Sequence, residues 1–214
     1  MTEPRRMLSL LLVSLLLVAQ WNHSLCDESS PGWPRFRGPN GSGVCDLYQF
    51  PTEIGAESFA WQVSLEGCGH ASPVAQNGRV FVASANGETG QQILAAYSTE
   101  SGKLIWRQSL PGKVFPKHAF NSFASSTPAL DANRLYYAWA TPESLQLVAM
   151  RQETGGIVWS KDLGPFVSQH GFGASPIVYG DTVILPNEQD GESFIIALDC
   201  ATGEVRWKTP RKSE

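Results

Sequence analysis

The chain has 214 residues and a formal net charge of −4, and it carries 20 Gly, 14 Pro and 7 Trp. This length is enough to bury a sizeable core, and a composition rich in these residues and modest in charge is typical of an all-β globular protein. The acidic balance argues against nucleic acid or an anionic membrane surface as a partner, because either would require a basic face.

A targeting signal opens the sequence. Arg5 and Arg6 precede an apolar run over residues 7–19, and polar residues follow it, so the pattern predicts a secretory signal peptide over residues 1–26. The apolar run is shorter than the about 20 residues that a membrane span needs, although an uncleaved N-terminal anchor stays open as an alternative. We therefore expect a periplasmic or extracellular protein with no membrane insertion beyond the signal segment.

Near-copies of one pattern fill the rest of the chain, after an N-terminal extended segment over residues 27–56. Each copy runs from an alanine through a turn that contains glycine to a tryptophan, and the copies end at Trp106, Trp159 and Trp207. Successive tryptophans, counted from Trp61, lie 45, 53 and 48 residues apart. Spacings that stay close to 50 residues indicate one structural unit repeated along the chain. The function is therefore expected to depend on an array of such units.

Each unit predicts a sheet of four antiparallel strands. In the first unit, over about residues 70–110, Asn77-Gly78 joins two apolar runs, which is a strong hairpin signal. Ser101-Gly102 then turns the third strand into the fourth. The same elements recur in the same order over about residues 120–163 and 171–210.

Three sets of recurring residues are predicted to have a structural role and not a chemical one. A proline opens the first strand of each unit, where a missing N–H costs the ladder least. A glycine recurs in the last turn, which needs a positive φ. The tryptophans bury large rings between neighbouring sheets. The prolines are Pro73, Pro128 and Pro176, the glycines Gly102, Gly155 and Gly203, and the tryptophans Trp61, Trp106, Trp159 and Trp207.

A four-stranded sheet with two apolar faces cannot stand alone, and radial stacking of such sheets gives a β-propeller. The pattern from Ala197 to Trp207 is similar to the tryptophan-docking motif of the pyrroloquinoline-quinone-type (PQQ-like) β-propellers. Residues 33–43 resemble the opening of secreted PQQ-like repeat proteins of planctomycete-type bacteria. The resemblance covers most of residues 33–207, and we expect PQQ-like repeats over residues 57–214.

The expected ring is incomplete. Propellers of the resembled family usually have eight blades, whereas three can be counted in this chain. Residues 57–65 match the fourth strand of a blade that lacks its first three strands, so we expect them to form an unpaired latch strand, as in relatives where such a strand closes the ring. The predicted fold class is therefore all-β, a partial propeller of three four-stranded antiparallel blades plus this strand, and the chain is predicted to be the first part of a longer propeller or a truncated gene product.

Three histidines are the candidate ligand-binding residues. His70, His118 and His170 each lie in the segment that enters the first strand of a blade. These connections gather at one mouth of a propeller's channel, so three imidazoles could converge on a ligand or a metal ion. They stand 3, 10 and 6 residues before the proline of their blade, so the competing interpretation is that each hydrogen-bonds its own loop.

The resemblance also raises the question of an enzyme. In quinoprotein dehydrogenases the quinone lies beside calcium, under a vicinal Cys-Cys disulfide and near an Asp base. This chain has no Cys-Cys pair, and Cys45, Cys68 and Cys200 show no metal-type spacing and allow at most one disulfide. We therefore expect neither a cofactor nor catalytic residues, because the fold alone does not confer the activity.

The sequence thus favours a secreted, non-catalytic propeller scaffold for protein–protein interaction in the cell envelope, with an unidentified protein partner. One alternative is a fragment of a PQQ-dependent dehydrogenase. Another is a glycan- or ligand-binding sensor module, for which the aromatic residues of the loops are candidates: Phe120, Phe123, Phe166 and Phe172.

Overall fold

The computed structural model describes residues 32–45 and 51–212. The predicted signal peptide lies outside this range. Within it, no helix has both the length and the apolar character that a membrane crossing requires.

The described chain forms three antiparallel sheets of four strands, each in simple chain order. The first contains β1 (Val74–Gln76), β2 (Arg79–Ala85), β3 (Gln92–Ser98) and β4 (Leu104–Leu110). The second contains β5 (Ala129–Leu130), β6 (Arg134–Thr141), β7 (Ser144–Arg151) and β8 (Ile157–Asp162). The third contains β9 (Ile177–Tyr179), β10 (Thr182–Asn187), β11 (Ser193–Asp199) and β12 (Val205–Arg211).

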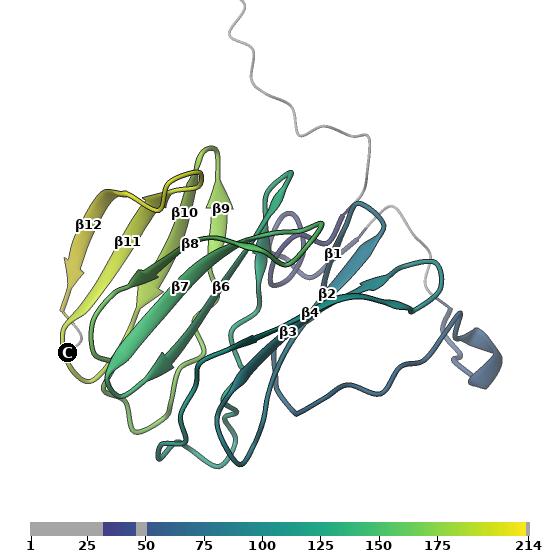
Figure 1. Ribbon diagram of the computed structural model, residues 1–214, viewed down its shortest axis with the longest axis horizontal. Helices are drawn as coiled ribbons and strands as arrows, with labels where there is room; N and C mark the ends of the chain where they lie inside the picture. The colour runs from purple at the N-terminus through teal and green to yellow at the C-terminus, as the bar shows by residue number, and fades with distance from the viewer. Residues whose placement is uncertain (1–31, 46–50, 213–214) are drawn as a thin grey trace, which may run out of the picture.

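The three sheets lie side by side and face to face, as successive blades of a propeller do (Figure 1). Their first strands are neighbours, because β1 contacts β5 and β5 contacts β9. The predicted fold class, an all-β partial propeller with three four-stranded blades, is confirmed by this arrangement.

Two hydrophobic cores fill the spaces between the blades. The core between the first and second blades includes Phe81, Leu94 and Tyr137, and the core between the second and third includes Leu147 and Val183. Residues alternate along β6, so that neighbouring side chains belong to different cores. The second sheet is therefore buried on both faces, which explains its long runs of apolar residues.

The same β-bulge recurs in every blade. The ladder between the third and fourth strands shifts register at one position in each sheet, between Ala96 and Tyr97 in the first, and at the equivalent residues in the others. Just beyond the shift, an alanine faces the motif tryptophan across the ladder, in the pairs Ala96–Trp106, Ala149–Trp159 and Ala197–Trp207. Bulges of this kind re-aim a side chain, and the small alanine leaves room for the large ring.

Three of the four motif tryptophans, Trp61, Trp106 and Trp159, dock on the glycine of the blade that follows them. A Cβ added to that glycine would lie 2.7 Å from the tryptophan ring in all three cases, and the glycine φ lies between +66° and +72°. The indole N–H donates to the carbonyl oxygen three residues before the glycine, at 2.8–3.1 Å. The pairs are Trp61 with Gly102 and Thr99, Trp106 with Gly155 and Gln152, and Trp159 with Gly203 and Cys200.

Hydroxyl groups link the blades at their first strands. Each of these strands begins one residue after its proline, and the residue before the proline is Ser or Thr. The backbone N–H of Ser72 donates to Thr127 Oγ1 at 3.0 Å, and the N–H of Thr127 donates to Ser175 Oγ at 2.9 Å. The hydroxyl of one blade thus satisfies the backbone of the preceding blade, a role that the sequence analysis did not assign.

The segment predicted as a latch strand differs from the expectation. Ala56–Ser58 forms a 3₁₀ turn (η1), and residues 59–65 belong to no strand. A strand requires a ladder partner, and the described residues offer none beside this segment. Trp61 nevertheless docks on the first blade, and the Cys68 and Ala85 backbones pair with each other, so the chain is anchored to the first blade in the middle of the segment and again just after it.

The N-terminal segment also joins the blades. Trp33 pairs with Ala75 of β1 through two backbone hydrogen bonds, and Leu130 of β5 donates to the Pro34 carbonyl oxygen at 2.8 Å. The ring of Trp33 lies 2.8 Å from the place where Gly38 would carry a Cβ. Residues 33–38 therefore fasten the first strands of two blades together.

Gly155→Ala tests the tryptophan docking. The new methyl group would meet the Trp106 ring in a backbone conformation with φ +70°, so we expect a loss of about 3 kcal/mol in the free energy of unfolding. Gly180→Ala is the matched control, because its φ is +58° but no atom lies within 4 Å of the new Cβ. Its cost should be about 1 kcal/mol. Equal losses in urea unfolding would contradict the docking.

Thr127→Val tests the hydroxyl links. Thr127 is 1% exposed, and the substitution keeps its shape but leaves the Ser72 N–H without an acceptor, at an expected cost of about 2 kcal/mol. Thr52→Val, at an exposed residue, should change the free energy of unfolding by less than about 0.5 kcal/mol. A Thr127→Val protein as stable as the Thr52→Val protein in thermal unfolding would refute the assigned role.

Candidate functional site

Three long connections meet at one end of the sheets. They lead into the first strands over residues 66–73, 111–128 and 163–176, and we call them the entry loops. Backbone hydrogen bonds tie the loops together: His70 and Ala71 donate to the Ala124 carbonyl oxygen at 2.9 and 3.0 Å, and His118 donates to that of His170 at 3.4 Å. The loops therefore form one surface made by several blades.

Asn121 is the centre of this arrangement. Its Nδ2 donates to the His170 carbonyl oxygen at 2.6 Å, while its Oδ1 accepts from the Ser122 N–H at 2.8 Å and from Ser125 Oγ. Gly171 permits the close approach, because a Cβ there would lie 2.9 Å from Asn121 Nδ2. A side chain bound from both sides holds the two longer loops in one conformation.

The three candidate histidines take different places. The rings of His118 and His170 lie 5.7 Å apart, and His118 Nδ1 accepts from the Phe120 N–H at 3.2 Å. His70 joins the entry loops through its backbone N–H, which also donates to Ser122 Oγ at 3.1 Å. Within residues 32–45 and 51–212, no group of three His, Cys, Asp or Glu side chains is placed to hold a metal ion. The structure therefore brings two of the three imidazoles together.

The four candidate phenylalanines of the loops differ in how far they are buried. Phe166 and Phe172 pack edge to face in the core between the second and third blades. Phe123 packs against Phe115, and the Lys117 ammonium lies 5.1 Å from its ring centre. Phe120, in contrast, is 86% exposed, and its ring stands 5.3 Å from that of His118.

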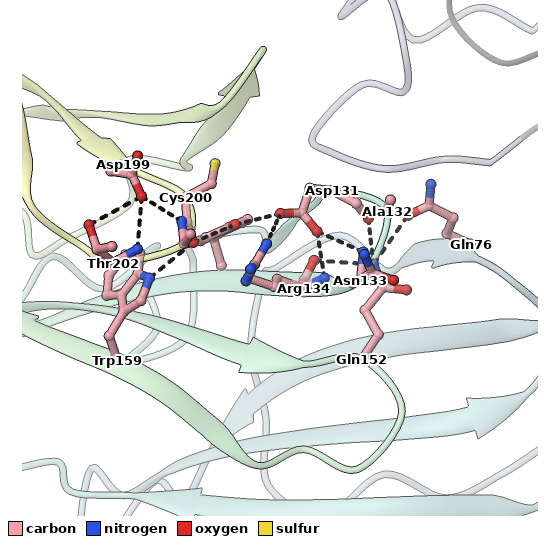
Figure 2. A network of polar contacts seen from close by, with 12 residues as sticks. Gln76, Asp131, Ala132, Asn133, Arg134, Gln152, Trp159, Asp199, Cys200 and Thr202 are labelled. Carbon is pink, nitrogen blue, oxygen red and sulfur yellow. Dashed lines mark hydrogen bonds and ion pairs between the residues drawn. The ribbon is translucent and has the colours of Figure 1, made fainter.

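A polar network crosses the opposite end of the blades (Figure 2). Asp131 Oδ1 accepts from the backbone N–H groups of Asn133 and Arg134, at 2.7 and 2.6 Å, and its Oδ2 accepts from Arg134 Nη1. Gln152 Nε2 donates to the Asp131 carbonyl oxygen at 2.7 Å and to Gln76 Oε1 at 3.2 Å. The network thus connects the turns of the first two blades.

Tyr136 extends this network to the third blade. Its hydroxyl group donates toward Asp131 Oδ2 and the Cys200 carbonyl oxygen, at 2.6 and 3.1 Å. Burial, together with these hydrogen bonds, raises the pKa of Tyr136 far above its ordinary value, and burial also raises the pKa of the Cys200 thiol. Both groups therefore stay protonated at neutral pH, which suits a structural role. Cys45, Cys68 and Cys200 are all free.

A family model described as outer membrane protein assembly factor BamB matches residues 55–214. The chain belongs to this family. A search of curated proteins finds no match. Membership agrees with the resemblance seen in the sequence, because the match includes all three blades and their docked tryptophans.

Solved structures show the same fold in much longer chains. A quinohemoprotein alcohol dehydrogenase from Comamonas testosteroni matches with a TM-score of 0.61 and 22% identity, over 84% of this chain and 27% of that one. A quinohemoprotein alcohol dehydrogenase from Pseudomonas putida matches with a TM-score of 0.50 and 19% identity, over 70% of this chain and 22% of that one. A europium-containing methanol dehydrogenase matches with a TM-score of 0.52 and 15% identity, over 68% of this chain and 25% of that one. The chain spans about a quarter of these enzymes, and at such identities the likeness concerns the fold alone.

The entry-loop anchors were missed by the sequence analysis. Asn121, Ser122 and Ser125 lie in a stretch without periodicity, so no spacing pointed to them. The Ser/Thr-Pro dipeptides did carry a signal, since a hydroxyl residue precedes the proline at the start of every blade. Its meaning becomes visible only when neighbouring blades are placed side by side.

Asp199 provides a prediction on pH dependence. The hydrogen bond from Arg206, with those from the turn N–H groups, lowers the pKa of Asp199 from 3.8 to about 2. A depressed pKa stabilises the folded state above the unfolded value, and this contribution is lost as the pH falls from about 4 to about 2. We therefore expect the stability difference between the native protein and Asp199→Asn to shrink over this range in urea unfolding. A difference independent of pH would contradict the assignment.

Proposed function

We propose that the chain is part of a secreted, non-catalytic β-propeller scaffold of the periplasm or the extracellular space, which binds a protein partner of the cell envelope through its entry loops. The observation that carries the proposal is Phe120, a large aromatic side chain that is 86% exposed on loops fixed by internal hydrogen bonds. Membership in a family described by an outer-membrane-protein assembly factor supports the same class of function.

Phe120 has the properties of an interface anchor. Aromatic residues dominate the binding energy of protein interfaces when they enter a pocket of the partner. The loop beneath Phe120 is fixed in advance, because Asn121 and His118 are both hydrogen-bonded on either side of it. Little conformational entropy is then lost on binding, and this raises the affinity of a rigid loop over that of a flexible one.

The polar groups beside Phe120 have structural partners, which favours binding over catalysis. The hydroxyl groups of Ser122 and Ser125 lie 2.8 Å apart, and Ser125 also donates to Asn121 Oδ1. Ser122 Oγ also accepts from the His70 backbone N–H, and among the described residues neither serine hydroxyl donates to a histidine or a carboxylate that could act as its general base.

The dehydrogenase alternative requires a quinone site. The described residues do not fit the group that the resemblance implies, since the free cysteines are not adjacent and no set of three metal-ligating side chains converges. If the alternative were right, adding PQQ and calcium would produce quinone absorbance and dye-linked oxidation of an alcohol or a sugar.

The glycan-binding alternative has little support from the loop aromatics. A sugar ring needs an exposed aromatic face, and of the four candidate phenylalanines Phe166 and Phe172 lie in the core, while Phe123 packs against Phe115. Phe120 is the large exposed aromatic of the set. A single anchor of this kind suits a protein pocket better than an extended saccharide.

The proposal is tested by a photo-crosslinking amino acid at position 120 in cells. We expect a discrete protein adduct from position 120 and none from position 100, an exposed site at the opposite end of the first blade. With the identified partner, Phe120→Ala should weaken binding by about 2 kcal/mol, roughly thirtyfold. Identical adducts from both positions, or none from either, would count against an entry-loop interface.

A further inference from the structure

A cavity of about 350 Å³ lies between the first and second blades, at the end opposite the entry loops. Three of the residues that line it are arginines, Arg79, Arg134 and Arg151, and one is acidic, Glu153. Asn77 and Asn133 also line it. A pocket with this lining is basic, although the whole chain is acidic.

The three arginines differ in how far they are already paired. Arg134 binds Asp131 through its Nη1 at 3.2 Å. Arg79 Nη1 donates to the Asn77 carbonyl oxygen at 3.1 Å, but its Nε is buried without a hydrogen-bond partner. Arg151 has no side-chain hydrogen bond and no ion pair within the described residues. The Arg79 Nε has almost no solvent-accessible surface, so it is the guanidinium group of Arg151 that keeps N–H donors available for a ligand.

The repeat shows that architecture does not require Arg151. The equivalent positions of the other blades are Ser98 and Asp199. Ser98 Oγ accepts from two backbone N–H groups of the following turn, and Asp199 Oδ1 accepts from two in its own turn. An arginine cannot accept these hydrogen bonds. The second blade therefore gives up a local turn cap and gains a guanidinium group at the pocket.

The matching groove between the second and third blades has the opposite charge. It is lined by Asp131, Asp181 and Asp199, together with Arg134. Arg206 pairs there with Asp181 and Asp199. Equivalent grooves between successive blades are thus basic in one case and acidic in the next. The positive charge is therefore a property of this pocket and not of the fold.

We propose that the pocket lined by Arg79, Arg134 and Arg151 binds an oxyanion of the phosphate or sulfate type. Planar guanidinium groups bind such groups through paired N–H···O hydrogen bonds, which are stronger than neutral ones. The Asn77 amide nitrogen is already bound to the Ala132 carbonyl oxygen and to Gln152 Oε1, so the guanidinium groups carry the proposal. Glu153 opposes the anion and sets a moderate affinity.

Calorimetric titration of the full chain with inorganic phosphate tests the proposal. Arg151→Ser restores the turn-capping residue of the first blade, so we expect binding to weaken at least tenfold while the melting temperature is unchanged or higher. Lys161→Gln removes a positive charge toward the far end of β8 and is the matched control, with unchanged binding expected. Equal losses in both variants would show a general charge effect and would overturn the site.

A second variant moves the affinity in the opposite direction. Glu153→Gln removes the carboxylate that lines the pocket, so it should tighten phosphate binding about threefold or more. Glycerol phosphate as a second probe distinguishes the sources of the group: equal or tighter binding indicates a phosphomonoester of a larger molecule, and binding of inorganic phosphate alone indicates the free ion. Heats no larger than those of sodium chloride at the same ionic strength, or no gain from Glu153→Gln, would refute the proposal.

Discussion

The docking of Trp61, Trp106 and Trp159 on the glycine of the following blade is the constraint on which the rest of the structure depends. Trp106 must pass within van der Waals distance of the Gly155 backbone, and its indole N–H must reach the Gln152 carbonyl oxygen. Only a residue without a side chain, at a positive φ, allows both. Since the tryptophan and the glycine belong to neighbouring units, the interaction holds the sheets face to face, and no single unit can make it alone.

With the blades fixed in this way, the two ends of the sheets are free to differ. The Ser/Thr hydroxyl links hold the first strands together, and the entry loops beside them gather Asn121 and Phe120 into one surface. At the other end the turns carry charge that varies from groove to groove. A rigid repeated scaffold with variable connections is the arrangement on which binding surfaces are commonly built.

The residues that recur in every blade could be predicted from the sequence, because they appear at the same position of each repeat. The tryptophans, the glycines and the order of strands follow directly from the copies, and the structure has three such sheets. What the sequence did not reveal depends on pairs of blades: the acceptor role of Thr127, and the meeting of His118 with His170 but not with His70. Residues 57–65 were expected to form a strand but do not. Whether a segment forms a strand depends on a neighbouring strand to pair with, and the residue pattern of the segment alone does not provide one.

Hydrogen exchange of the tryptophan indole N–H groups, followed by nuclear magnetic resonance, tests the docking most directly. Trp106 and Trp159 donate to carbonyl oxygens of the next blade, whereas Trp207 is 44% exposed and docks on no glycine within the described residues. Trp61 also donates to the next blade, to the Thr99 carbonyl oxygen, but this hydrogen bond is exposed. We expect slow exchange for Trp106 and Trp159, intermediate exchange for Trp61 and fast exchange for Trp207. Exchange at one common rate for all four would contradict the central claim.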